Sequence, residues 1–400
     1  MDIEIQISEL MSEHSSPLGS NEDRLIRIPA VLREKLGLKT GLFLCLTSKS
    51  DGSIPFQISP AYSDDVEKNS DKCGYVSKDT YEQLRIEKKH SSLVKPVSDI
   101  LIGADPEFFL VDKETGGNVS ASHFFMHYGD VGSDCGLAEL RPRPSFNEYE
   151  LVSNLRDLMI KAYQHLGSRI LFKNRKIEMT AASMLNGAAA GFHIHFGLPN
   201  VLLKGTTESH IVLKRMVDVL DYYVGILSIL PEGSEDFYRR SDNSIYGKPG
   251  DYRSDHLTLE YRVPGGHLLR HPLLTAGILG ISITIMKDLL SRLKIYSDNY
   301  EKIYRLKEYK DLLDLYPKLP SKEEVYASIT SNNTNKAILY MKAIMDDMSK
   351  MVGYADRAKS IANYFDYVLS YIKHGKKFNE SIEYNWRLRD EEQSREMAVL

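Results

Sequence analysis

The stretch Ile102-Gly-Ala-Asp-Pro-Glu-Phe-Phe-Leu110 places two acidic side chains, Asp105 and Glu107, two positions apart within β-type sequence. On a β-strand such residues point to the same face of the sheet, about 7 Å apart. On a helix they would diverge by about 200°. The stretch therefore predicts a strand that presents both carboxylates to one cavity.

Three further segments repeat this spacing of two polar residues within β-type sequence. Their pairs are Glu139 with Arg141, His193 with His195, and Glu260 with Arg262. The residues between them (Leu140, Ile194 and Tyr261) would then face the opposite side of the sheet and hold it on a core. Taken as strands, the four segments predict one cavity lined by carboxylates, imidazoles and guanidiniums.

This inventory of side chains indicates a chemistry. Carboxylate oxygens suit hard divalent ions such as Mg²⁺ or Mn²⁺, imidazole can complete the shell, and guanidinium groups bind phosphate oxygens through paired donors. Phosphoryl transfer needs such positive charge around a polyphosphate. The sequence contains no GxxxxGK[ST] loop, so a nucleotide would need another cradle. A Gly- and Pro-rich loop at 246–253 is the candidate, because it carries Lys248 and Arg253 and follows Arg239 and Arg240.

Together and in this order, the four segments and the loop resemble the phage-type carboxylate–amine ligases, also called amidoligases. That group is similar to an outlying branch of the glutamine synthetase and glutamate–cysteine ligase superfamily. The resemblance covers about residues 100–275. It implies an α+β fold in which a curved, mainly antiparallel, glutamine-synthetase-like sheet is packed by helices.

The resemblance also implies a role for each matching position. The implied metal ligands are Asp105, Glu107, Glu139, His193 and Glu260, and the first of them is Asp where the superfamily's Glu-x-Glu strand has Glu. Asp134 lies near the place of a further acidic ligand. The resemblance implies contacts to nucleotide or phosphate for His195 and Arg253. Lys248 and Arg141 complete the predicted nucleotide- and phosphate-binding set because they are basic residues beside the motifs. Catalytic roles fall to Arg253, Arg262 and Glu139.

The implied reaction is ligation driven by ATP. ATP phosphorylates a carboxylate to an acyl phosphate, with Mg²⁺ or Mn²⁺ bridging the phosphates, and an amine then forms an amide or isopeptide bond. The two substrates stay open among amino acids, peptides, cell-wall fragments, protein side chains and modified nucleobases. Two other functions stay open too: a phosphotransferase of the guanidino-kinase type on the same fold, and a catalytically inactive DNA-binding or assembly protein. Intact acids at every metal position argue against inactivity.

The amino-acid composition changes along the chain and predicts its division into segments. We expect a leader at 1–20, a small β-rich module at 21–97, the ligase domain with a helical C-terminal part at 98–374, and a charged tail at 375–400. Apolar spacing predicts helices at 147–166 and 208–230, and breakers separate further helices at 273–293, 297–315, 322–329, 334–350 and 355–373.

The segment from Leu25 to Leu46 runs as strand, short helix, Gly turn and strand. It resembles the swapped-hairpin modules of AbrB-type transcription factors, whose role is dimeric DNA binding. Basic residues are sparse in this segment, so a dimerisation module or a substrate lid is the favoured interpretation. Members of the ligase superfamily often assemble into homo-oligomers, which makes self-association part of the same expectation.

Composition and charge predict a soluble protein of the cytoplasm, the host's if the chain is phage-encoded. The chain is 42% hydrophobic and 26% charged, and its net charge of −4 does not indicate a nucleic-acid coat or a membrane-surface protein, although local charged patches stay open. Lys287 and Asp288 interrupt the apolar run at 273–290, which predicts a buried helix and no membrane span. Three widely spaced cysteines, Cys45, Cys73 and Cys135, indicate neither a disulfide framework nor a CxxC metal site.

Overall fold

The computed structural model describes residues 100–168, 177–203, 205–233, 236–240, 246–255, 257–293, 316, 320–375 and 378–388. All of them belong to one unit of the chain, Pro96–Leu400. The expected leader at 1–20, the AbrB-like β module at 21–97 and the helix at 297–315 lie outside the described residues.

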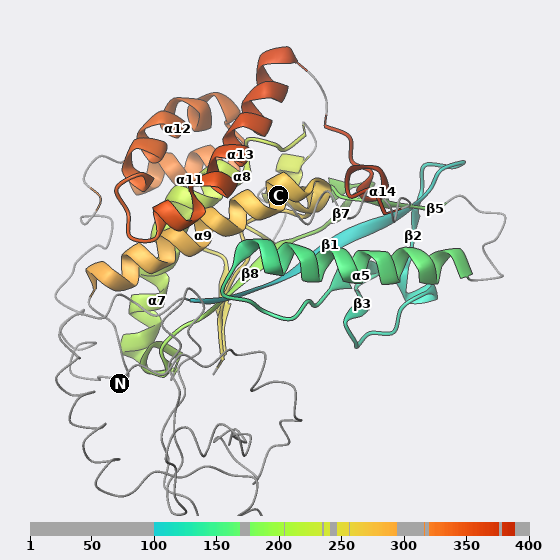
Figure 1. The fold of residues 1–400 in the computed structure, drawn as a ribbon, viewed down its shortest axis with the longest axis horizontal. Helices are drawn as coiled ribbons and strands as arrows, with labels where there is room; N and C mark the ends of the chain where they lie inside the picture. Colours follow the sequence, from blue (N-terminus) through green and yellow to red (C-terminus); the bar gives the residue numbers. More distant parts are fainter. Residues whose placement is uncertain are drawn as a thin grey trace, which may run out of the picture. The chain divides into compact units, whose positions relative to one another are not determined.

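An antiparallel sheet forms the centre of the fold (Figure 1). Its strand order is β3 (Val131–Asp134), β4 (Leu137–Leu140), β1 (Leu101–Asp112), β8 (Phe192–Gly197), β10 (Leu259–Tyr261) and β9 (Tyr252–Ser254). The end of β1 also pairs with β2 (Asn118–Val119) and β5 (Ile177–Thr180), and β6 (Met184–Leu185) forms a hairpin with β7 (Ala188–Ala189). The four segments with spaced polar pairs therefore supply β4, β1, β8 and β10, which are neighbours in the sheet.

One face of this sheet is apolar and belongs to the main hydrophobic core. Residues that alternate with the polar positions along the strands lie there, each at most 5% exposed: Ile102, Ala104, Phe108, Leu140, Ile194 and Tyr261. The predicted orientation of Leu140, Ile194 and Tyr261 toward the core is confirmed. Their burial holds the strands in place, and so the polar positions on the other face are rigidly supported.

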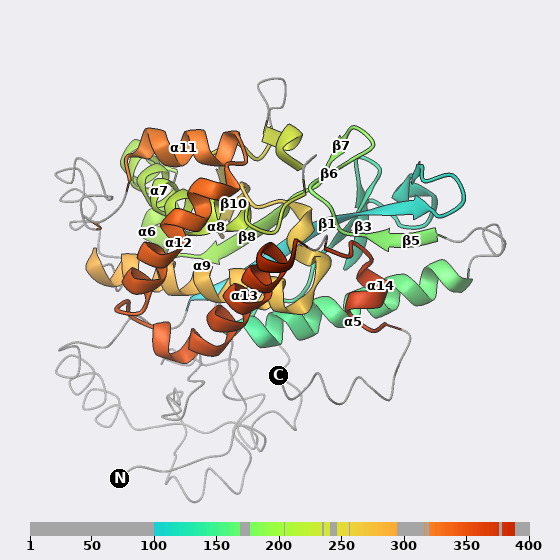
Figure 2. The same cartoon turned by 90° about the horizontal axis from the view of Figure 1, so that it is seen from above.

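Helices cover the apolar face (Figures 1 and 2). α5 (Glu148–Ser168) lies against β1, β3 and β4, and α9 (Pro272–Arg292) packs between α5, α7 (Thr207–Leu220) and α13 (Tyr354–His374). α11 (Lys322–Thr330) and α12 (Thr334–Met348) follow the predicted helices at 322–329 and 334–350. The remaining short turns are η1 (Ala121–His123), α6 (Asn200–Leu203), η4 (Asp236–Arg240) and η5 (Gly266–Arg270). The predicted α+β class is confirmed.

α9 is apolar on all sides because it is buried on all sides. It begins at Pro272, and the ring of His271 caps it by accepting the Leu273 N–H at 3.1 Å. Its length and hydropathy would suffice to cross a membrane, but 94% of its apolar window is buried inside the structure. Lys287 and Asp288 are buried as well. The prediction of a buried helix at 273–293 is confirmed.

A π-helical turn interrupts the predicted helix at 208–230. The segment runs as α7, then the π turn η3 (Asp221–Gly225), then α8 (Ile226–Ser228). Within η3 the fully buried Asp221 accepts a hydrogen bond from the Tyr261 hydroxyl at 2.7 Å. Since Tyr261 neighbours Glu260 on β10, this turn is fastened directly behind a strand that carries a predicted metal ligand.

Residues 378–388 pack against the domain, beyond the boundary at 374 that the composition predicts. They form the short helix α14 (Ile382–Asn385) and a bridge from Ser381 to Thr180 of β5. Trp386 is fully buried and donates its Nε1–H to the Leu269 carbonyl at 2.7 Å. This part of the expected charged tail is therefore part of the folded domain.

Candidate active site

The register of the sheet puts the predicted site residues on one face. Directly opposed residues of antiparallel strands share a face. The opposed pairs are Glu107–Glu139, Asp105–His193, Gly103–His195, His195–Glu260 and Glu260–Arg253. Because these pairs are linked by shared members or by two-residue spacing, all of them lie on the face opposite the helices.

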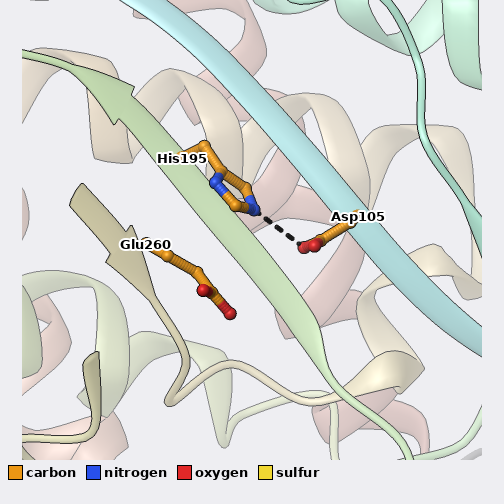
Figure 3. A group of neighbouring side chains, drawn as sticks. All are labelled: Asp105, His195 and Glu260. Carbon is orange, nitrogen blue, oxygen red and sulfur yellow. Dashed lines mark ion pairs between the residues drawn. The ribbon is translucent and has the colours of Figure 1, made fainter. Parts of the chain in front are cut away.

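Two carboxylates and two imidazoles form a tight group in the middle of this face. Asp105 Oδ1 lies 3.1 Å from His195 Nε2 and 3.3 Å from His193 Nδ1, and the same His193 Nδ1 lies 3.4 Å from Glu260 Oε1. Figure 3 shows Asp105, His195 and Glu260 converging from three neighbouring strands. One ligand atom from each of these three lies within 4.8 Å of the others. A single metal ion can bridge such a spacing, because metal–ligand distances are about 2.0–2.6 Å.

Opposite charges within this group stabilise one another. Burial raises the pKa of Asp105, but the imidazoles of His193 and His195 outweigh burial and hold that pKa well below its usual value. Burial lowers the pKa of His195, but Asp105 and Glu260 outweigh it and raise the pKa. Asp105 Oδ1 is nevertheless buried without an aligned hydrogen bond from any described residue. A buried carboxylate oxygen left in this way is costly, and direct binding to a cation removes the cost.

Glu107 and Glu139 form a second acidic pair beside this group, and both are more than nine-tenths buried. Glu107 Oε2 accepts the Gly191 N–H at 2.6 Å and the Tyr246 hydroxyl at 2.9 Å, and Glu139 pairs with Arg141. Burial and the neighbouring carboxylates raise the pKa of Glu139 to about 7, although Arg141 opposes them. Carboxylates packed this closely repel one another unless positive charge lies between them.

These donors fit a hard divalent ion. Carboxylate oxygen with some imidazole nitrogen is a donor set that suits Mg²⁺ or Mn²⁺, and no described cysteine joins it. Asp105, Glu260 and the two histidines would hold one such ion, and Glu107 with Glu139 would hold a second. The resemblance implies a metal for His193 and a phosphate for His195. The structure places both rings against Asp105, so either imidazole is available to a cation.

Three basic residues of the predicted site, Arg262, Arg253 and Lys248, come from the end of β10, from β9 and from the loop beside them. Arg262 Nε is 3.2 Å from Glu260 Oε1, and its Nη1 is 3.6 Å from Asp251 Oδ1. Arg253 is exposed on the edge strand β9, directly opposite Glu260. Lys248 lies in a turn that Asp251 closes by accepting the Gly247 N–H at 2.8 Å. Exposed or partly exposed cations therefore border the acids on the side of the 246–253 loop.

Arg239 and Arg240, which precede the predicted phosphate-binding loop, contact protein groups beneath the site. Both are fully buried. Arg240 binds the two carboxylate oxygens of Glu232 at 2.7 and 2.5 Å. Arg239 donates to the backbone carbonyls of Val263 at 2.7 Å and Arg262 at 2.9 Å. The two arginines fasten backbone beneath the site.

Tyr246 is a site residue that strand spacing does not identify. Its hydroxyl reaches both Glu107 and His193, which lie 139 and 53 positions earlier in the chain. No periodic pattern marks it, because it stands in a loop. The one signal in the sequence is an aromatic residue directly before the Gly247–Gly250 turn.

Comparison with known proteins gives one family match. A family model described as phage phiEco32-like COOH.NH2 ligase-type 2 matches residues 102–388, which is more than half of the chain. The match contains every residue of the site described above and ends at the close of the packed tail segment. No curated protein matches the sequence.

Three of the solved structures that match share little sequence with the chain. A bifunctional glutathione synthetase from Pasteurella multocida has 11% identity and a TM-score of 0.41 over 78% of this chain and 53% of its own. The ligase PafA, solved with the prokaryotic ubiquitin-like protein Pup, has 11% identity and a TM-score of 0.45, over 75% of this chain and 70% of PafA. A glutamine synthase homologue has 10% identity and a TM-score of 0.37 over 94% and 87%. The chain spans about half the length of the glutathione synthetase.

Proposed function

The chain belongs to the family of phage phiEco32-like COOH.NH2 ligases of type 2, and from this premise we propose that it joins a carboxylate to an amine through an acyl phosphate made from ATP. The family accounts for carboxylate–amine ligation in general. The observation that supports the finer proposal is the convergence of acids and imidazoles on one rigid sheet face with arginines at its border: Asp105, Glu107, Glu139, His193, His195, Glu260, Arg141, Arg253 and Arg262.

The proposed reaction has two steps. A carboxylate oxygen of the first substrate attacks the γ-phosphorus of ATP, the bond from that phosphorus to the β–γ bridging oxygen breaks, and ADP leaves. The amine nitrogen then attacks the acyl carbon, the bond from that carbon to the phosphate oxygen breaks, and inorganic phosphate leaves as the nitrogen loses a proton. The products are an amide or isopeptide, ADP and phosphate.

The acidic centre is assigned to the phosphates of ATP. A divalent cation bound there supplies the positive charge that neutralises and orients phosphate oxygens during transfer. The contribution of the chain is to hold its donors rigid, because Asp105 and Glu107 stand on the central strand and are backed by buried apolar residues. Preorganised charge of this kind lowers the barrier without reorganisation during the reaction.

The arginines are assigned to the transferred phosphoryl group. Arg262 is held between Glu260 and Asp251, so its guanidinium keeps a defined orientation. Arg253 is exposed opposite Glu260, where it is open to a ligand. We assign Arg253 to the γ-phosphate and Arg141, beside Glu139, to the remaining nucleotide phosphates. The substrates are small molecules or peptides that carry the carboxylate and the amine, and a cytoplasmic setting stays a prediction.

The test uses the full chain with ATP and Mg²⁺ or Mn²⁺, incubated with pooled amino acids, amines and peptides. Release of ADP and phosphate is expected to rise in a pool that holds both substrates, and mass spectrometry should find a product with the summed mass of acid and amine less one water. Glu107→Gln and Glu260→Gln should reduce turnover by roughly 100-fold or more. Glu323→Gln changes an exposed acid of α11 and is the matched control.

Two results would overturn the proposal. A stable phosphorylated product without an amide would identify a phosphotransferase of the guanidino-kinase type. Absence of turnover in every pool, together with a strongly salt-dependent affinity for DNA, would identify a binding protein.

A further inference from the structure

Tyr246 joins the two acidic groups of the site. Its hydroxyl donates to Glu107 Oε2 at 2.9 Å and lies 2.5 Å from His193 Nε2. The two rings meet edge to face, with centroids 5.5 Å apart and an interplanar angle of 82°. One phenol thus connects a carboxylate of the Glu107–Glu139 pair with an imidazole of the group around Asp105.

The single proton of this hydroxyl requires an N–H at Nε2 of His193. Since the O–H is donated to the Glu107 carboxylate, the phenol oxygen accepts from His193 Nε2–H. When a cation takes the place of any proton on Nδ1, the ring keeps its proton on Nε2 and the lone pair of Nδ1 is directed at the cation. The Nδ1 atom lies 3.3 Å from Asp105 Oδ1 and 3.4 Å from Glu260 Oε1. Three electron-pair donors then face one another with no proton between them, and a cation relieves their repulsion.

The surroundings are shaped around this contact. A Cβ atom on Gly191 would lie 2.4 Å from His193 Nε2 and 2.6 Å from the Tyr246 hydroxyl, so a side chain at position 191 would push the two apart. The Tyr246 ring lies against the guanidinium groups of Arg239 and Arg262, whose Cζ atoms are 4.8 and 4.9 Å from its centroid. The ring is therefore held from several sides and keeps the hydroxyl in place.

We infer that Tyr246 is a positioning residue that fixes the Nε2–H tautomer of His193 and so directs the Nδ1 lone pair toward the cation held with Asp105 and Glu260. This inference rests on the proposed function, because it assigns His193 to a divalent cation. A group that hydrogen-bonds the far nitrogen of a metal-binding histidine orients the ring, and its loss typically weakens metal binding by about 10–100-fold.

The first readout is the tautomer itself. The full chain is labelled with ¹⁵N-histidine, loaded with Mg²⁺, and examined by long-range ¹H–¹⁵N correlation, with a His193→Gln variant to assign the signals of position 193 among the 12 histidines. The wild-type ring should carry its proton on Nε2 alone. Tyr246→Phe keeps the ring and its edge-to-face contact but removes the hydroxyl, so His193 Nδ1 should lose the cation and carry a proton in its place.

The second readout is binding of Mn²⁺ alone, followed by electron paramagnetic resonance of the free ion. Tyr246→Phe should weaken binding by about 10–100-fold, and Gly191→Ala should do the same by separating the two groups. The matched control is Tyr252→Phe, which removes the hydroxyl from another Tyr–His contact, 3.1 Å from His210 Nδ1, on the opposite face of the sheet. It should leave both readouts unchanged.

Neither readout needs ATP or a substrate, so the inference and the proposed function can fail separately. An Nδ1–H tautomer in the wild type would overturn the inference, as would a Tyr246→Phe variant with unaltered tautomer and Mn²⁺ affinity. A tautomer and an affinity that respond to Tyr246→Phe, in a protein that ligates nothing, would uphold the positioning role and reject the proposed reaction.

Discussion

Replacing Arg240 with Met is expected to destabilise the protein strongly, because the change leaves a buried carboxylate without its partner. Both side chains of the Arg240–Glu232 pair are 0% exposed. The nearest remaining donors described for Glu232 are the Ser183 hydroxyl at 3.4 Å and His267 Nδ1 at 3.6 Å. Burial holds the pKa of His267 well below its usual value, so that ring is neutral and cannot replace the lost charge.

The magnitude follows from the geometry of the pair. Removing one partner of a buried, hydrogen-bonded ion pair typically costs about 3–5 kcal/mol. At about 1.4 kcal/mol per factor of ten, the unfolding equilibrium constant should rise by roughly two to four orders of magnitude. Met retains most of the aliphatic volume of Arg, so little of this loss is due to a cavity. Adding Glu232→Gln to Arg240→Met removes the stranded charge and should recover part of the loss.

Urea unfolding measures the change, with the fluorescence of Trp386, the sole tryptophan, and far-ultraviolet circular dichroism as independent probes. A loss below about 1 kcal/mol for Arg240→Met would contradict the reasoning, and so would a double variant less stable than the single one. Unchanged stability combined with a raised KM for ATP would instead assign Arg240 to phosphate binding.

Three further predictions test other parts of the molecule. Trp386→Ala should lower the free energy of unfolding by about 3–5 kcal/mol in urea, since it leaves a cavity and frees the Leu269 carbonyl; a loss below about 1 kcal/mol would place 378–388 outside the domain. Arg253→Ala changes an exposed position, so the stability should stay within about 0.5 kcal/mol while ligation slows roughly 100-fold; undiminished turnover would remove its assigned role. Burial raises the pKa of Asp221 to about 8, against about 3.9 in an unfolded chain, so the folded state keeps a proton that the unfolded state releases. Stability should therefore fall as the pH rises from about 4 to 8, and Asp221→Asn, which still accepts from Tyr261, should flatten that slope; parallel profiles in urea unfolding would reject the effect.

The spacing of polar residues predicted the faces of the sheet but not the order of its strands. Two-residue spacing placed Asp105 and Glu107 on one face, and the same rule held for His193 with His195. Spacing carries no information on which strands pair, because pairing is set by contacts across the chain. That Glu107 stands opposite Glu139, and that His195 lies between Gly103 and Glu260, follows from the register of the folded sheet. The resemblance to carboxylate–amine ligases implied a shared site, and the register supplies its arrangement.

Buried polar residues outside the strands were the part that the sequence did not predict. In the sequence Arg240 resembles a surface cation in a loop. Its structural role becomes visible only in the fold, where it is buried together with Glu232, eight positions earlier. Trp386 lies in a charged segment of the sequence, yet it hydrogen-bonds to Leu269 of η5. Tyr246 has no periodic partner at all. In each case the contact that defines the residue's role joins two segments, and a pattern within one segment carries no information about the other.

The division of labour in the site follows from the point at which β1 changes partners. β1 pairs with β8 along 101–106 and with β4 at 107–108. Asp105 therefore faces imidazoles, whereas Glu107, two residues further on, faces a second carboxylate, and one strand serves two donor groups of different composition. The pairing of the strands keeps the two groups apart, because Asp105 lies beside β8 and Glu107 lies beside β4. The Tyr246 hydroxyl hydrogen-bonds to both groups, and Tyr246 comes from the loop that also carries Lys248 and leads to Arg253. A ligand that moves this loop will consequently change the donors of both groups at once, so under the proposed function nucleotide binding and cation binding should each alter the affinity of the other.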